Sequence, residues 1–185
     1  LQKPATPDVR HDDFPSLPEP AVVRPEGVAS ILVTGIGGTG VVTIGQVLGM
    51  AAHVDGLCCS VLDVTGLAQK YGAVLSHVRI AARQADLHAT RISAGEADTV
   101  VGCDLIVSAG DEAVSKMRSG HTRIAVCTDP IPTAEFARNP EWRVDVPALQ
   151  AKIAGAPAEV FSVEGIRIAP ALLGDPIAAN LFMLG

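Results

Sequence analysis

Apolar positions between residues 31 and 53 change their spacing at a cluster of glycines. The run Ile31–Thr34 is continuous and β-branched, which predicts a buried strand. Beyond the glycines, apolar residues recur at the spacing of one helical face; they are Val41, Ile44, Val47, Leu48 and Ala51. The pattern therefore predicts a strand, a glycine turn and a helix, which together form the first half of a βαβ unit.

The glycines of this turn fit a phosphate-binding pattern. Gly35, Gly37 and Gly40 match G-x-G-x-x-G, and Gly38 and Thr39 complete the turn. A residue without Cβ lets another group approach the backbone, and the free N–H groups of the helix's first turn favour an anion. These five residues are candidate binding residues. The same glycines would also serve a turn that only packs the helix tightly on the strand, and the motif leaves both interpretations open.

Two further strands are predicted at Cys58–Val64 and Ala73–Ala81. The eight-residue connector between them, 65–72, is shorter than the dozen or so residues that a parallel crossover needs. We therefore expect the third strand to run antiparallel to the second, in a mixed sheet.

The rest of the chain alternates between short helical and strand patterns. It predicts a short helix at 96–102, a strand at 104–109, a helix from 110 to about 118, a strand at 123–128, a surface loop at 131–144, a helix at 147–154, a strand at 160–163, and helices at 166–173 and 176–184. The predicted fold is a three-layer α/β/α domain with a mostly parallel, mixed sheet. Residues 1–29 carry six prolines and are predicted to be a linker or arm, which leaves 30–185 as a domain that looks cut at its C-terminus.

Composition narrows the function classes. Hydrophobic residues make up 48% of the chain and aromatic residues only 3%, which predicts an aliphatic core. The net charge of −6 and the lack of a basic run argue against nucleic-acid binding, and no apolar stretch is long enough to span a bilayer. Four cysteines, none in a C-x-x-C pair, are predicted to be free thiols rather than metal ligands, as in a cytoplasmic protein.

Candidate catalytic groups are sparse. Five histidines are scattered without a partner at ligand spacing, and His77 on a strand is predicted to be structural. No Walker lysine and no nucleophile elbow is present. Asp63 follows Gly40 by about 20 residues, the separation at which an acid binds the ribose of a dinucleotide. An ordinary aspartate at a strand end is the alternative. We expect this chain to support chemistry that takes place on other domains.

The motifs resemble the gamma-type domain of 2-oxoacid:ferredoxin oxidoreductases, and most closely that of the indolepyruvate enzymes in their fused form. Four blocks carry the resemblance, namely GIGGTGVVTIGQVLGMAA (35–52), VLDVTGLAQKYGAVLSHVRIA (61–81), GEADTVVGCDLIVSA (95–109) and LLGDPIAANLFMLG (172–185). One departure from the family pattern is Tyr71, where the family tends to have glycine.

The resemblance implies a thiamine-diphosphate enzyme that decarboxylates a 2-oxoacid oxidatively, passes the acyl group to coenzyme A and sends electrons through iron–sulfur clusters to ferredoxin. Thiamine and the clusters would lie on partner domains, within a homo-oligomeric cytoplasmic enzyme. We predict that Gln69, Lys70 and Tyr71 contact CoA or a partner domain beside the glycine turn. Two alternatives remain open: a dinucleotide-binding oxidoreductase domain and a non-catalytic interaction module.

Overall fold

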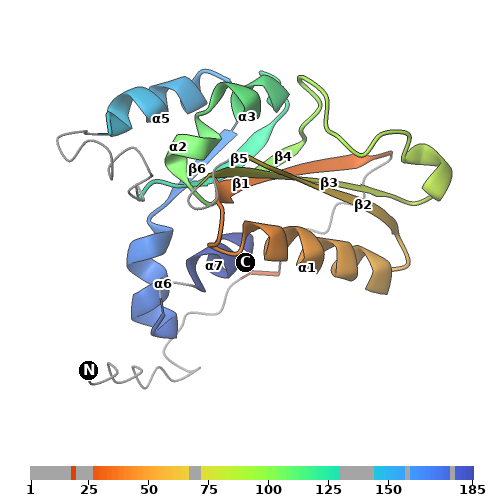
Figure 1. The fold of residues 1–185 in the computed structure, drawn as a ribbon, viewed down its shortest axis with the longest axis horizontal. Coiled ribbons are helices and arrows are strands. Elements are labelled where there is room, and N and C mark those ends of the chain that lie inside the picture. The colour runs from red at the N-terminus through yellow and green to blue at the C-terminus, as the bar shows by residue number, and fades with distance from the viewer. Residues whose placement is uncertain (1–17, 20–26, 67–71, 130–143, 157–158, 176–177) are drawn as a thin grey trace.

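One six-stranded sheet organises the molecule (Figure 1). The computed structural model describes residues 18–19, 27–66, 72–129, 144–156, 159–175 and 178–185. The strands are β1 (Ala29–Ile36), β2 (Cys58–Thr65), β3 (Ala73–Ala81), β4 (Thr99–Gly102), β5 (Arg123–Cys127) and β6 (Glu159–Val163). Their order across the sheet is β2-β3-β1-β4-β5-β6.

The strand directions confirm the predicted mixed sheet. β1, β4, β5 and β6 pair in parallel, whereas β3 runs antiparallel to both of its neighbours, β1 and β2. β3 therefore separates β2 from β1. The short connector before β3 explains this arrangement, because it allows only an antiparallel return to the sheet.

Helices cover both faces of the sheet, so the three-layer prediction is confirmed (Figure 1). The helices are α1 (Val41–Val54), α2 (Leu105–Ser108), α3 (Asp111–Lys116), α5 (Val146–Ala154), α6 (Gly165–Leu173) and α7 (Ala179–Leu184), with a 3₁₀ turn at Gln84–Asp86. Leu32 of β1 joins the core beneath α2, α3 and α5. The next residue, Val33, joins the core against α1 and α7. Alternation along one strand thus feeds two aliphatic cores.

Two predicted elements are wrong. Residues 96–102 were expected to be a short helix, but Thr99–Gly102 forms the central strand β4, paired with β1 and β5. Threonine and the two valines of this strand are β-branched, and the strand is buried on both sides by its neighbours.

The second error concerns residues 104–109, which were expected to be a strand. They contain the helix α2, because the Asp104 carboxylate accepts a hydrogen bond from Val107 N at 2.8 Å and so caps a helical turn. Leu105 is fully buried in the core, and this packing outweighs the strand preference of Ile106 and Val107.

Several predictions fall on parts of the chain beyond the described residues. They are most of the arm 1–29, nearly all of the loop 131–144, and the three residues Gln69, Lys70 and Tyr71. β1 begins at Ala29, slightly earlier than predicted. Within the described ranges, each helix falls short of the length and apolarity that crossing a bilayer would require.

Candidate functional site at the glycine turn

The glycine turn lies where the chain leaves two adjacent parallel strands in opposite directions. β1 leads into α1 on one face of the sheet, and its neighbour β4 leads into α2 on the other face (Figure 1). Cys103 N donates to Thr34 O at 2.8 Å and closes the two strand ends together. Ligands of open α/β sheets bind at such a switch point, outside the carboxyl ends of the strands.

Three glycines of the turn meet different steric demands. Gly38 and Gly40 have φ of 87° and 95°, a region that other L-residues adopt with strain. A Cβ on Gly35 would lie 2.5 Å from Val41 Cγ2, so this position is closed to any side chain.

Gly37 has neither of these features. It is not among the described glycines with positive φ, and a Cβ there would meet its nearest neighbour, Gly72 O, at an ordinary 3.4 Å. Gly37 instead contributes its N–H, which donates to Gly72 O at 2.8 Å.

A hollow of about 320 Å³ opens at the turn. It is lined by Ile36, Gly37, Gly38, Gly40, Val41, Val42, Thr43 and Val74. In the described part of the chain, the N–H groups of Val41, Val42 and Thr43 have no hydrogen-bond acceptor, as is usual for the first turn of a helix. The first turn of α1 also contains no acidic residue, and its N-cap, Gly40, offers no side-chain acceptor. The hollow is therefore bordered by free donors at the positive end of a helix dipole, an arrangement that suits an anion.

A residue from the far end of the sequence supports this turn. Asn180 of α7 donates from Nδ2 to Thr39 O at 2.5 Å and to Thr39 Oγ1 at 2.9 Å. Sequence reasoning placed Thr39 in the site but missed Asn180. The only available signal was an amide standing between apolar residues in the block LLGDPIAANLFMLG.

Asp63, the acid on which the dinucleotide alternative depends, lies away from the glycine turn. Asp63 lies opposite Ser76 of β3, which in turn lies opposite Val33 of β1. Two strand spacings, about 10 Å, therefore separate Asp63 from the strand that enters the turn. Its side chain is exposed on the edge strand β2. A dinucleotide site of the usual kind has this acid on a strand directly beside β1, so the geometry disfavours that interpretation.

One described end of the 67–71 loop, Gly72, lies beside the glycine turn, and the other, Gly66, bonds to the start of β3. Gly72 O accepts the hydrogen bond from Gly37 N, and Gly66 N donates to Ala73 O at 3.1 Å. The predicted roles of Gln69, Lys70 and Tyr71 fall outside the described residues and stay predictions. Both described ends lie at the end of the sheet where β1 leads into the turn.

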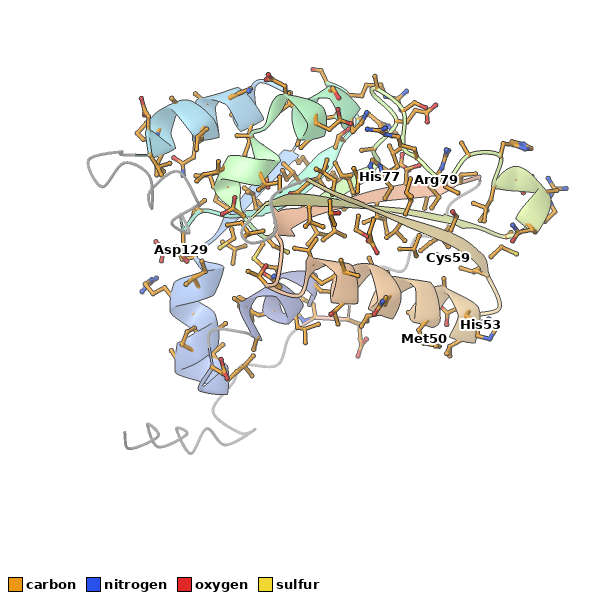
Figure 2. All side chains as sticks on the ribbon, in the orientation of Figure 1. Met50, His53, Cys59, His77, Arg79 and Asp129 are labelled. Atoms are coloured by element: carbon orange, nitrogen blue, oxygen red, sulfur yellow. The ribbon has the colours of Figure 1, made fainter. Side chains whose placement is uncertain are left out.

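Other titratable groups near the sheet are structural. His77 is fully buried on β3, and its Nδ1 accepts a hydrogen bond from Ile92 N at 3.2 Å (Figure 2). Cys103 lies behind the turn, and burial raises the pKa of its thiol to about 12, with smaller contributions from Cys127 and Asp104. This thiol stays protonated and packs as a small hydrophobe. No group of three or more metal-ligating side chains is found in the portion of the chain that the structure describes.

Sequence comparison places these features in a known family. Residues 30–185 match the model of the pyruvate ferredoxin/flavodoxin oxidoreductase family. The chain belongs to this family. The match covers the whole sheet except the first residue of β1, and it includes the glycine turn and α7.

Curated relatives that the chain matches are indolepyruvate oxidoreductase subunits. The indolepyruvate oxidoreductase subunit IorB of Methanothermobacter thermautotrophicus is 27% identical over 158 residues, which are 84% of this chain and 76% of that protein. IorB of Thermococcus kodakarensis is 33% identical over 72 residues, which are 39% of this chain. That match spans only about a third of the Thermococcus protein, 34% of its length.

Solved structures share the fold. The pyruvate oxidoreductase subunit PORC of Thermotoga maritima superposes with a TM-score of 0.60 at 19% identity, over 86% of this chain and 74% of that one. A 2-oxoglutarate:ferredoxin oxidoreductase from Magnetococcus marinus, with 2-oxoglutarate, coenzyme A and succinyl-CoA bound, has a TM-score of 0.58 at 16% identity. This match covers 85% of our chain but 23% of that longer one. The family resemblance and the fold expected from the sequence are thus confirmed.

Proposed function

We propose that this chain is the gamma-type part of a thiamine-diphosphate-dependent 2-oxoacid:ferredoxin oxidoreductase whose substrate is an aryl pyruvate such as indolepyruvate. The observation that carries the proposal is the family match over 30–185, together with relatives that are named indolepyruvate oxidoreductase subunits. The enzyme would be a cytoplasmic homo-oligomer with partner domains for thiamine, the iron–sulfur clusters and the docking of ferredoxin.

The proposed reaction is balanced by two electrons and one proton. The bond between the carboxylate and the carbonyl carbon of the 2-oxoacid breaks and releases CO₂. A thioester bond forms between that carbonyl carbon and the sulfur of CoA, whose thiol proton is released. Two electrons pass to ferredoxin. We assign the redox steps to the iron–sulfur clusters of partner domains, as the family resemblance implies.

Within this reaction, the proposed task of the glycine turn is to bind a phosphate group of CoA. The hollow at the turn, the three N–H groups without acceptors and the absence of acid from the first turn support an anionic ligand. CoA is the co-substrate of this reaction that carries phosphates. Lys70, in the loop that leads to Gly72 beside the turn, is proposed to add a positive charge there.

The proposal is tested on the assembled enzyme, purified with its partner subunits and supplied with thiamine diphosphate, CoA and an electron acceptor. Indolepyruvate and phenylpyruvate should give higher kcat/KM values than pyruvate and 2-oxoglutarate. A higher value for pyruvate or 2-oxoglutarate would contradict the proposed substrate class. As a control, the isolated chain should oxidise none of the four acids, since the chemistry is assigned to other domains.

A further inference from the structure

The contact between Asn180 and Thr39 joins two segments that are 141 residues apart. Asn180 is only 6% exposed, on the helix α7 that packs against α1, β4 and β5. The orientation of its amide is fixed by chemistry. Thr39 O can only accept a hydrogen bond, so the NH₂ end of Asn180 must face it, and the same nitrogen also reaches Thr39 Oγ1.

The consequence for the turn is that the oxygens of Thr39 are occupied. Its carbonyl accepts from Asn180, and its hydroxyl accepts from Asn180 while donating to Ile36 O at 2.7 Å. Thr39 N also donates to Ile36 O, at 3.3 Å. Asn180 thus ties both oxygens of Thr39 to α7, and Thr39 is not among the residues that line the hollow. The N–H groups of Val41, Val42 and Thr43 beside it have no acceptor among the described residues. A hollow that is bordered by N–H donors, with the two oxygens of Thr39 held against another helix, favours an anion over a neutral or cationic ligand.

We propose that Asn180 is a positioning residue: it holds the glycine turn in the form that selects a phosphate group, although it lies on a different element and outside the hollow's lining. This inference rests on the proposed CoA site. It goes beyond that site because it assigns to α7, whose Asn180 follows Thr39 by 141 residues, the role of setting the shape of a turn near β1. The two positive-φ glycines on either side of Thr39 explain the need for such a support, because they leave the turn free to adopt other conformations.

Two substitutions distinguish removal of the Asn180–Thr39 hydrogen bonds from their replacement by electrostatic repulsion. Asn180→Ala removes both hydrogen bonds and leaves the oxygens of Thr39 free to turn toward the hollow. Asn180→Asp keeps the size of the side chain but places a carboxylate oxygen against Thr39 O, which repels it and adds negative charge near the anion site. The matched control is Gln150→Glu, the same amide-to-acid change at an exposed position of α5, on the opposite face of the sheet (Figure 1).

The first measurement is amide hydrogen exchange on the assembled enzyme without CoA. Both Asn180 variants should speed the exchange of peptides covering residues 37–44 by about fivefold or more, since one to two neutral hydrogen bonds are lost. Peptides covering β4 should exchange as in the wild type, and Gln150→Glu should change neither region. Unchanged exchange at 37–44 in both Asn180 variants would overturn the positioning role.

The second measurement is the KM for CoA, with the KM for the 2-oxoacid as the internal reference. We expect an increase of about fivefold for Asn180→Ala and of about tenfold or more for Asn180→Asp, with the KM for the 2-oxoacid unchanged. Equal values of the CoA KM in wild type and Asn180→Asp would overturn the inference.

A further variant, Thr43→Glu, tests the proposed CoA site independently. Thr43 is exposed in the first turn of α1 and lines the hollow, so a carboxylate there should repel a phosphate while it suits the helix end. If Thr43→Glu raises the KM for CoA and Asn180→Asp does not, the CoA site stands and the role of Asn180 is wrong. If Thr43→Glu leaves that KM unchanged, the CoA site itself is wrong, and the selection of its phosphate by Asn180 is wrong with it.

Discussion

Two helix starts at the same edge of the sheet are built in opposite ways. After β4, the fully buried Asp104 side chain accepts a hydrogen bond from Val107 N and closes the start of α2 from within. After the neighbouring strand β1, the N-cap of α1 is Gly40, which has no side chain to offer, and the first N–H groups face a hollow. At the start of α2 an N–H group is bonded by a side chain of the protein itself. At the start of α1 the N–H groups are available to a ligand.

The open start is the exception among the longer helices that the structure describes, α1, α5 and α6. Asp145 accepts from Ala148 N at the start of α5. Asp129, which lies at the start of α6 in Figure 2, accepts from Ile166 N at 2.9 Å and from Arg167 N at 3.2 Å. Carboxylates cap α5 and α6. The uncapped N-terminus of α1, at a switch point of the sheet, is therefore the structural feature that most directly indicates a ligand.

The largest expected effect on stability comes from adding a side chain at Gly35, at the end of β1. Gly35→Val would place Cβ 2.5 Å from Val41 Cγ2 and 3.2 Å from Cys103 Cβ, both buried. We expect the free energy of unfolding to fall by about 3 kcal/mol or more, through overpacking at a site that cannot expand. Thermal and denaturant unfolding measure the change. A variant as stable as the wild type would show that α1 does not approach β1 this closely.

The closed helix start should matter for folding and not for the ligand. Asp104→Ala removes the cap of α2 and should lower the free energy of unfolding by about 1–2 kcal/mol. The KM for CoA of the assembled enzyme should not change. Asp104→Asn, which keeps an oxygen acceptor for Val107 N, is the matched control and should lose less stability. A shift in the KM for CoA in Asp104→Ala would remove the distinction between the two helix starts.

We expect acid to destabilise the core around the buried His77. Burial holds the pKa of His77 below its ordinary value, and Arg91 and Lys116 add to this effect. The unfolded chain therefore binds the proton first as the pH falls. The contribution of His77 is complete above pH of about 6.5 and is lost below it, with a slope of up to about 1.4 kcal/mol per pH unit.

His77→Asn tests this pH dependence, since its side-chain oxygen can take the place of Nδ1 as the acceptor for Ile92 N but does not titrate. In this variant the free energy of unfolding should no longer fall with pH between about 6.5 and the lower pKa that His77 has in the folded protein. An identical pH profile in His77→Asn and the wild type would show that another group causes the acid sensitivity.

The smallest effect is expected at the middle glycine of the motif. At Gly37 a Cβ has only ordinary contacts, at 3.4 Å to Gly72 O and 3.5 Å to Val74 Cγ2, and the N–H bond to Gly72 is kept. Gly37→Ala should change the free energy of unfolding by less than about 1 kcal/mol. Gly40→Ala, at φ of 95°, should cost more, because alanine is strained there. A larger loss at Gly37 than at Gly40 would reverse our account of which glycines shape the turn.

The sequence predicted what local pattern determines. The strand, turn and helix at 31–53 are specified by apolar spacing and glycine, and the antiparallel β3 follows from the length of one connector. The two wrong elements are short apolar runs in which periodicity does not separate helix from strand. At 104–109 the deciding feature is the carboxylate of Asp104. The apolar run that follows it predicts a strand, but Asp104 caps a helix.

The site could be predicted only in its local half. The turn residues 35–40 were identified from spacing, and their exposed donors follow from the missing cap. The support from Asn180 depends on how α7 packs against α1, a contact across 141 residues that no local pattern encodes. The exclusion of Asp63 likewise required the strand order, since the insertion of β3 between β1 and β2 is what moves this acid away from the turn.

The central claim is that the open start of α1 holds a phosphate of CoA while the closed start of α2 does not. The most direct test is amide hydrogen exchange of the assembled enzyme with and without saturating CoA, read at both helix starts. We predict slower exchange in peptides covering residues 37–44 on addition of CoA, and no change in peptides covering 104–109. Exchange at 37–44 that is the same with and without CoA would contradict the account.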